Sequence, residues 1–131
     1  MYMLDTNICI YIIKSQPPSV LEKFKQKAIG SVTMSLITYG ELEYGALRSN
    51  NSTKALGILQ ELKNYIPVLS ADESVAEHYA DIRADLAAKG TPIGNNDLWI
   101  AAHARASNHI LVSNNIKEFN RVENLQLENW V

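Results

Sequence analysis

Three carboxylates in this chain stand where carboxylates could act together: Asp5, Glu41 and Asp97. Asp5 directly follows the apolar run at residues 2–4, Glu41 lies within an apolar helical pattern, and Asp97 heads another such pattern. Carboxylates brought to one crevice repel one another, and without a counter-charge at least one of them must hold a proton. A divalent cation removes this repulsion, and Mg²⁺ and Mn²⁺ prefer hard oxygen ligands. The set therefore suits phosphoryl chemistry, in which the metal binds phosphate oxygens, lowers the pKa of a bound water and stabilises the leaving oxygen.

Each of these residues also has a purely structural interpretation. Asp5 and Asp97 can serve as helix caps, because aspartate is a preferred residue at the N-terminal cap. Glu41 lies on the surface if the predicted helix phase is wrong by one position. The polar residues Ser113 and Asn115, which follow the apolar run 110–112, can be ordinary turn residues. The coincidence of several such residues favours the functional interpretation.

The elements that must position these side chains are short apolar strands alternating with helices. We predict strands at residues 2–4, 32–35, 67–69 and 110–112. Segments with helical periodicity follow the first three, and the last leads into the polar run 113–115. Ser52, Asp72 and Asp97 are predicted to head helices, and Gly30, Gly90 and Asn108 to end them. This pattern implies a parallel sheet covered on both faces, so the predicted fold is α/β: a three-layer α/β/α sandwich with a short central parallel sheet. The ligand crevice of such a sheet lies beyond the carboxyl ends of its strands.

Length and composition bound the remaining possibilities. The 131 residues suit one domain spanning 1–131, with 47% hydrophobic and 20% charged residues, as in ordinary globular proteins. The net charge is −2, so any polyanion partner must be held locally or through a metal rather than by a global field. The single Cys9 excludes an internal disulfide, and neither a leader segment nor a membrane-spanning stretch is indicated. We expect a soluble, cytoplasmic protein.

Four segments resemble the signature blocks of PIN-domain ribonucleases, in particular the VapC toxins of bacterial VapBC toxin–antitoxin pairs. The segments are Met3–Asn7, Ser35–Gly45, Pro92–Ala104 and Leu111–Phe119. They occur in the family's order and together span nearly the whole chain. No single block is specific, and the strength of the resemblance lies in four blocks in register.

This resemblance implies a role for individual residues. Asp5, Glu41 and Asp97 would be the catalytic acids that bind the metal, with Mg²⁺ as the cofactor and Mn²⁺ as a plausible substitute. Thr6 and Asn7 would orient Asp5 or contact the phosphate of the substrate.

The last block departs from the family pattern at one position. Ser113 would hold the hydroxyl of this block, but Asn115 falls where many PIN domains carry a fourth acidic residue. An amide oxygen can ligate a metal or hold a water, yet it adds no negative charge, so a tightly bound second metal is in doubt. Glu118, three residues later, is a candidate substitute for that acid.

The resemblance also implies an activity and partners. The activity would be Mg²⁺-dependent endonucleolytic cleavage of RNA by the toxin of a toxin–antitoxin pair, which inhibits translation. The partners would be a second copy of the chain and a small VapB antitoxin that folds over the toxin and blocks its site, with DNA contacted only through the antitoxin. The block Pro92–Asp97 is similar to the branch that cuts initiator tRNA in its anticodon region.

Two other functions compete with this one. A haloacid-dehalogenase-like phosphatase also places an aspartate after its first strand, but it normally has a second aspartate two positions later, where this chain has Asn7. A catalytically weak module that binds RNA or a partner is the second alternative, and the replacement of an acid by Asn115 suggests it.

Several other ionisable residues have a structural interpretation as well as a functional one. Three lysines, Lys23, Lys25 and Lys27, could join Lys14, Arg48 and Lys54 in a phosphate-binding rim or form a solvated helix face. Glu73, Glu77, Asp81 and Asp85 form an acidic stripe at helical spacing. His103 lies about 240° around an ideal helix from Asp97, so we expect it to be structural.

Overall fold

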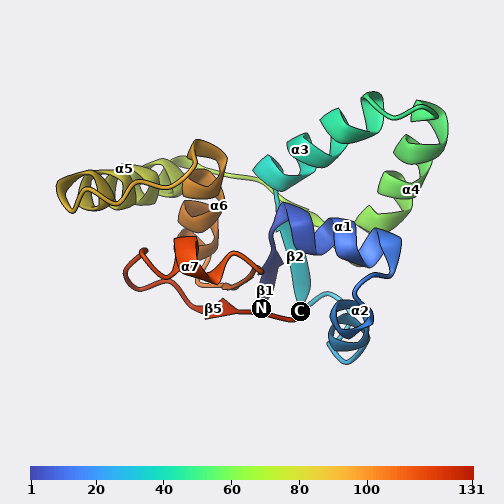
Figure 1. Ribbon diagram of the computed structural model, residues 1–131, viewed down its shortest axis with the longest axis horizontal. Coiled ribbons are helices and arrows are strands. Elements are labelled where there is room, and N and C mark those ends of the chain that lie inside the picture. The colour runs from blue at the N-terminus through green and yellow to red at the C-terminus, as the bar shows by residue number, and fades with distance from the viewer.

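Five short parallel strands form the centre of the molecule (Figure 1). The computed structural model describes all residues from 1 to 131. The strands are β1 (Tyr2–Leu4), β2 (Val32–Ser35), β3 (Val68–Leu69), β4 (Ile110–Val112) and β5 (Leu127–Glu128), and they lie side by side in the order β3-β2-β1-β4-β5. The four predicted strands are therefore present. The prediction missed β5, because two residues are too few to show the alternation that marks a strand, and this strand exists only through its pairing with β4.

Helices cover both faces of this sheet, as the three-layer prediction requires. They are α1 (Thr6–Lys14), α2 (Pro18–Lys25), α3 (Leu36–Leu47), α4 (Ser52–Tyr65), α5 (Glu73–Ala88), α6 (Asn95–Ala106) and α7 (Ile116–Phe119). Leu4 and Val112 of the sheet pack with apolar residues of α1 to α4, whereas Met3 and Leu111 pack with those of α5 to α7. Because neighbouring strand residues point to opposite faces, β1 and β4 each contribute to both hydrophobic clusters.

The ends of the helices agree with the predicted caps in part. Asp72 caps α5 by accepting a hydrogen bond from Ser74 N, and Gly90 follows that helix with a φ of 69°. The prediction that Ser52 caps α4 is wrong, because the side chain of Asn51 accepts from Lys54 N and Ser52 is already helical. The segment that begins at Pro18 also ends earlier than predicted, at Lys25.

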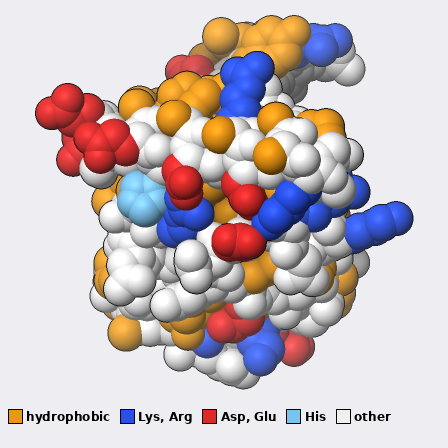
Figure 2. All heavy atoms as spheres, turned by 90° about the vertical axis from the view of Figure 1, so that its left-hand side faces the viewer, with side chains coloured by type: hydrophobic (Ala, Val, Ile, Leu, Met, Phe, Trp, Pro, Cys, Tyr) orange, Lys and Arg blue, Asp and Glu red, His pale blue; other side chains and the backbone are white.

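The acidic stripe on α5 has partners within the chain. Arg105 Nη2 lies 2.6 Å from Asp81 Oδ2, and Lys89 Nζ lies 3.0 Å from Asp85 and 2.7 Å from Glu123. Figure 2 shows acidic and basic side chains interleaved on the side of the molecule toward which α5 projects. These contacts tie α5 to α6 and to the segment after α7, although exposed pairs of this kind contribute little to stability individually. None of the helices is long and apolar enough to cross a membrane.

Candidate active site

Asp5 lies at the carboxyl end of the central strand β1 and begins α1. Its Oδ1 accepts a hydrogen bond from Ile8 N at 3.0 Å, so the structural role of an N-cap is real. The residue is nevertheless 6% exposed, and burial raises the pKa of its carboxyl above the ordinary value. Hydrogen bonds from Ser113 and Ile8 oppose that shift, and the charge of Glu41 adds to it. Asp5 is therefore both a cap and a buried carboxylate that faces other acids.

Glu41 reaches the same edge of the sheet from the second turn of α3. Its Oε1 accepts a hydrogen bond from Thr6 Oγ1 at 2.6 Å, and Thr6 also lies 3.4 Å from the hydroxyl of Thr38. Glu41 is half-buried beside the buried residue Leu42, so the predicted helix phase is correct. Thr6 thus orients Glu41, whereas the resemblance implied that it orients Asp5 or contacts the phosphate.

Asp97 enters the site from the first turn of α6. The helix begins at Asn95 after Gly94, which makes no side-chain cap, so the prediction that Asp97 heads the helix is wrong by two residues. A Cβ placed on Gly94 would lie 3.8 Å from Asp97 Oδ2 and 3.7 Å from Glu118 Oε1, which puts these two carboxyl groups around one point. Asp97 is consequently free of a capping role and faces Glu118.

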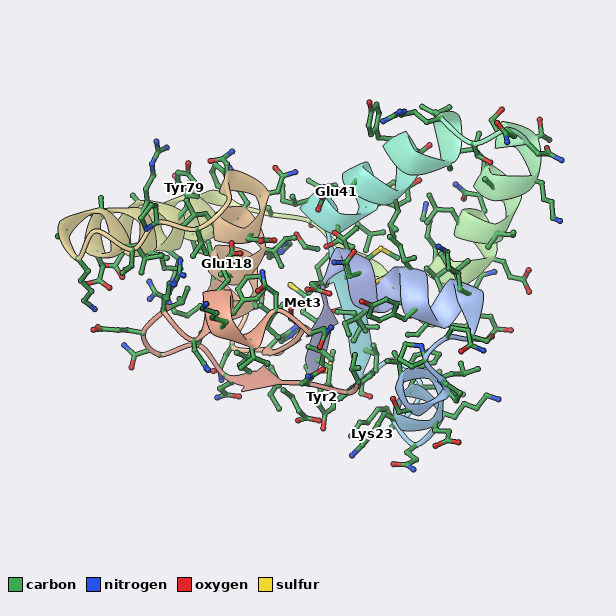
Figure 3. All side chains as sticks on the ribbon, in the orientation of Figure 1. Tyr2, Met3, Lys23, Glu41, Tyr79 and Glu118 are labelled. Atoms are coloured by element: carbon green, nitrogen blue, oxygen red, sulfur yellow. The ribbon has the colours of Figure 1, made fainter.

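Glu118 is the fourth acid of the site, although it lies one helix away from Asp97 in the sequence. Gly94 N donates to its Oε1 at 2.9 Å and Asn115 Nδ2 donates to its Oε2 at 2.7 Å. Burial disfavours the ionised form, but these two hydrogen bonds, a third with Asp97 and the charge of Arg121 together outweigh it and lower the pKa of Glu118. Asn115 therefore holds Glu118 in place, and Figure 3 shows Glu118 on α7.

The electrostatics of Asp97 show how crowded this edge is. Burial raises the pKa of Asp97 to about 7, with contributions from its hydrogen bond to Glu118 and from the charges of Glu118, Asp5 and Glu41. Asp97 thus interacts electrostatically with the other two predicted acids, Asp5 and Glu41, and with Glu118, the candidate fourth acid. Burial and the neighbouring acids thus both disfavour the ionised form of Asp97.

This pKa predicts a pH-dependent stability that Asp97→Asn removes. The pKa of Asp97 is about 7 in the folded chain and 3.8 at its ordinary value, so the folded state binds the extra proton between these two values. The free energy of unfolding of the metal-free chain therefore falls as the pH rises from about 4 to about 7. Urea denaturation in EDTA at several pH values measures this effect. Across this window, the free energy of unfolding of Asp97→Asn should rise relative to that of the parent by about 1–2 kcal/mol, after allowance for solvent screening. A parallel pH dependence in the two proteins would contradict the assignment.

The donor set fits a hard divalent cation that keeps part of its water shell. As the side chains stand, no three His, Cys, Asp or Glu residues are grouped closely enough to ligate one ion directly. Glu41 is held by Thr6, and Asp97 is held by Glu118. Mg²⁺ usually retains several waters and is bound by one or two carboxylates plus substrate phosphate, so it does not need a closed protein cage. The site therefore provides oxygen ligands and an excess of negative charge for such a cation.

The remaining predicted residues have distinct positions. Ser113 is buried, accepts a hydrogen bond from Asn115 N at 2.9 Å and donates one to Asp5, so it lies in the site as expected. Asn7 is exposed on α1 and makes no side-chain hydrogen bond within the chain, so it does not orient Asp5. Figure 3 shows Lys23 on α2 near Tyr2, at the amino ends of the strands, far from Glu41. The lysines of α2 therefore do not border this site.

His103 connects the elements that carry the acids. Its Nδ1 lies 2.8 Å from Ser35 Oγ, and its Nε2 lies 3.2 Å from the carbonyl oxygen of Ser70. Because a carbonyl only accepts, Nε2 carries the hydrogen, and the Ser35 hydroxyl donates to Nδ1 while accepting from Ile37 N. Burial lowers the pKa of His103, which keeps the ring neutral, as this pattern requires. The predicted structural role thus extends to holding α6 against the start of α3.

We expect His103→Ala to lower the free energy of unfolding by about 2–4 kcal/mol, because the buried hydroxyl of Ser35 loses its acceptor and the carbonyl of Ser70 loses its donor. Equilibrium urea denaturation measures this loss. The matched control is His109→Ala, since His109 is half-buried and its Nδ1 has no hydrogen-bond partner. Equal losses for the two variants would show that the buried network of His103 adds nothing.

Comparison with known proteins agrees with this geometry. The model of the PIN domain family matches residues 2–125. Ribonuclease VapC2 of Haemophilus influenzae is 45% identical over 130 residues, which are 99% of this chain and 98% of that protein. The tRNA(fMet)-specific endonuclease VapC of Shigella flexneri is 43% identical over 129 residues, 98% of this chain and 97% of that protein.

A solved structure shows the same fold. VapBC2 from Rickettsia felis, bound to a DNA fragment from its promoter, has a chain that superimposes with a TM-score of 0.93 at 40% identity, covering 99% of this chain and 98% of that one. Because the match to the PIN family covers residues 2–125, it excludes the haloacid-dehalogenase-like alternative. Sequence, fold and acidic edge agree, and the chain belongs to the PIN-domain family, among the VapC ribonucleases.

Proposed function

We propose that this chain is the toxin of a toxin–antitoxin pair and cleaves RNA endonucleolytically with Mg²⁺, for which Mn²⁺ can substitute. PIN-domain ribonucleases generally depend on a divalent metal, and the acidic edge of this sheet is chemically suited to one. The observation that carries the proposal is the approach of Asp5, Glu41, Asp97 and Glu118 to one edge of the sheet, where burial and the interactions with the other three acids raise the pKa of Asp97 to about 7. Residues 1–131 would act as one catalytic domain.

In this proposal Asp5, Glu41 and Asp97 hold the metal, and Glu118 adds the fourth negative charge. The bound metal would supply an activated water and neutralise the phosphate. Ser113 positions Asp5 and Asn115 positions Glu118, each by the hydrogen bond described above. Asn7, exposed beside Asp5 at the start of α1, is free to contact the substrate phosphate.

The proposed substrate is initiator tRNA, cut in its anticodon region, by analogy with the relative named as a tRNA(fMet)-specific endonuclease. The test is incubation of the purified chain and Mg²⁺ with initiator tRNA and, as a matched control, elongator methionine tRNA. We expect one cut in the anticodon region of the initiator alone. Cutting of both tRNAs alike would refute the substrate, and tight RNA binding without any cutting would favour the alternative of a catalytically weak binding module.

An antitoxin of the VapB type is the proposed partner, and a groove beside the acids supports this. The groove has a volume of about 340 Å³ and is lined mainly by apolar residues of α1, α3 and α4, with Glu41 at its border. An amphipathic antitoxin segment would fill it, and a cationic side chain would then reach Asp5 or Asp97. Contact with DNA would come only through the antitoxin, as the DNA-bound VapBC2 complex suggests, and the toxin would form a homodimer.

The hydroxyl of Thr6 gives a sharp test of how Glu41 is oriented. Thr6→Val keeps the shape of the side chain but removes the 2.6 Å hydrogen bond to Glu41, so we expect cleavage to fall about 10- to 100-fold, as for other partners of metal ligands. Thr6→Ser retains the hydroxyl and should restore most of the rate. Initial rates on the same tRNA measure both variants, and a failure of serine to rescue would assign the loss to packing.

A further inference from the structure

A second cavity opens beside the first turn of α6, between that helix and α5. Its volume is about 290 Å³, and it is lined by residues of α5, α6 and the loop between them, among them Arg83, Leu86, Pro92, Ile93, Asn95 and Leu98. Leu86 and Leu98 are buried and form an apolar floor, whereas Arg83 and Asn95 are exposed at the rim. No carboxylate lines this cavity, in contrast to the acidic edge next to it.

A chain of hydrogen bonds fixes the polar rim. Arg83 Nη1 donates to Tyr79 Oη at 2.8 Å, and Tyr79 donates its single hydroxyl hydrogen to Asn95 Oδ1 at 2.9 Å. The ring of Tyr79 stacks on Trp99 with centroids 3.8 Å apart and an interplanar angle of 11°, which immobilises the hydroxyl. Figure 3 shows Tyr79 where α5 meets α6.

These contacts leave several N–H donors at the rim without partners in the chain. The amide oxygen of Asn95 accepts from Tyr79, and its Nδ2 group makes no hydrogen bond within the chain. The guanidinium of Arg83 uses one nitrogen for Tyr79 and keeps the Nε and Nη2 side of its fork unpaired. A flat ligand with an apolar face and two adjacent acceptors matches such a rim.

The cavity is also placed to act with the acidic site. Asn95 is the first residue of α6 and Asp97 the third, so the two sites lie around the same helical turn, about one helix diameter apart. The loop at 92–94 forms part of the wall of the cavity and also supplies Gly94 N to Glu118. An RNA whose phosphate lies at the acids would therefore have a neighbouring base within reach of the cavity.

We propose that this cavity binds one unstacked guanine of the RNA substrate, next to the cleaved phosphate, and so determines the sequence preference of cleavage. The inference rests on the proposed ribonuclease activity. A volume of about 290 Å³ lies at the small end of ligand pockets and suits a single base. Proteins read unstacked bases in RNA by stacking and by hydrogen bonds to base edges, and arginine pairs with the O6 and N7 acceptors of guanine.

The first experiment measures binding without any cleavage. Equilibrium titration in EDTA with the four nucleoside 5′-monophosphates should show GMP binding the chain at least about tenfold more tightly than CMP or UMP. Arg83→Met removes the fork, and Asn95→Asp keeps the acceptor for Tyr79 but replaces the Nδ2 donors by an acceptor. Each should weaken GMP binding about tenfold or more, whereas Lys63→Met, which loses the same charge on α4, should not. Equal binding of all four nucleotides, or equal effects of Arg83→Met and Lys63→Met, would overturn the proposal.

The second experiment separates the cavity from the activity. Cut sites in a random single-stranded RNA library with Mg²⁺ should show guanine enriched at one fixed position beside the cut, and Arg83→Met should remove this enrichment while Lys63→Met retains it. Cleavage without base preference, combined with no GMP binding, would refute the cavity and leave the ribonuclease intact. GMP binding without cleavage of any RNA would refute the activity and support the cavity as a base-binding site.

Discussion

Asp97→Asn is expected to reduce Mg²⁺-dependent RNA cleavage by about 10³-fold or more. The carboxyl of Asp97 interacts with Glu118 and with the charges of Asp5 and Glu41, so all three of the other acids act on it. Asparagine has nearly the same shape, but it removes the charge that would hold a cation against the phosphate. A loss of 10³-fold corresponds to about 4 kcal/mol of transition-state stabilisation, which is the scale of metal catalysis.

Initial rates on initiator tRNA at saturating Mg²⁺ measure this loss. The matched control is Glu22→Gln, which makes the same change of charge on the exposed surface of α2, away from the acidic edge. We expect Glu22→Gln to cut at the parental rate. Because Asp97→Asn should also be more stable than the parent in EDTA, a loss of activity cannot be attributed to unfolding. Parental rates for Asp97→Asn would exclude this aspartate from the mechanism.

Removal of divalent metal is expected to have an effect of the same size. Without a cation, four acidic side chains face an anionic phosphodiester, and the burial of Asp5 leaves little water to screen their repulsion. Chelation by EDTA should therefore lower cleavage by about 10³-fold, and added Mg²⁺ or Mn²⁺ should restore it. Cleavage that continues at the full rate in EDTA would refute a metal-dependent mechanism.

Binding of the metal has a readout that does not depend on activity. Mg²⁺ that binds the folded chain stabilises it by about 2.7 kcal/mol at a hundredfold excess over its dissociation constant. The midpoint of thermal unfolding of the parent should rise with Mg²⁺ concentration. Asp97→Asn should show a smaller rise, because it has lost one of the acids that make the cation favourable. An equal rise in the two proteins would place the bound ion elsewhere.

The acidic edge was predictable because its parts follow from local patterns. Asp5 and Ser113 come directly after short apolar runs, and the ends of parallel strands meet at one edge of a sheet. The spacing of apolar residues also predicted correctly that Glu41 lies close to the buried side of its helix. The resemblance of the four segments to the family blocks then predicted that Asp97 lies in the same site as Asp5 and Glu41.

Other features could not be predicted from local patterns. Glu118 was a candidate only as a substitute for Asn115, and it joins the site because Gly94 N, 24 residues earlier, donates to it. Thr6 was expected to orient Asp5 or to contact the phosphate, and its hydrogen bond to Glu41, 35 residues away, was not foreseen. The strand β5 exists only because β4 offers it an edge to pair with.

The sequence by itself determined the alternation of strands and helices, the three-layer fold and the edge at which the acids gather. These depend on periodicity and on strand ends, which are properties of short segments. The tertiary structure alone decided which acid each hydroxyl and amide serves, and it formed the second cavity between α5 and α6. The physical reason is that a hydrogen bond needs its two atoms placed to within a few tenths of an ångström, and only the packing of distant segments fixes positions that closely.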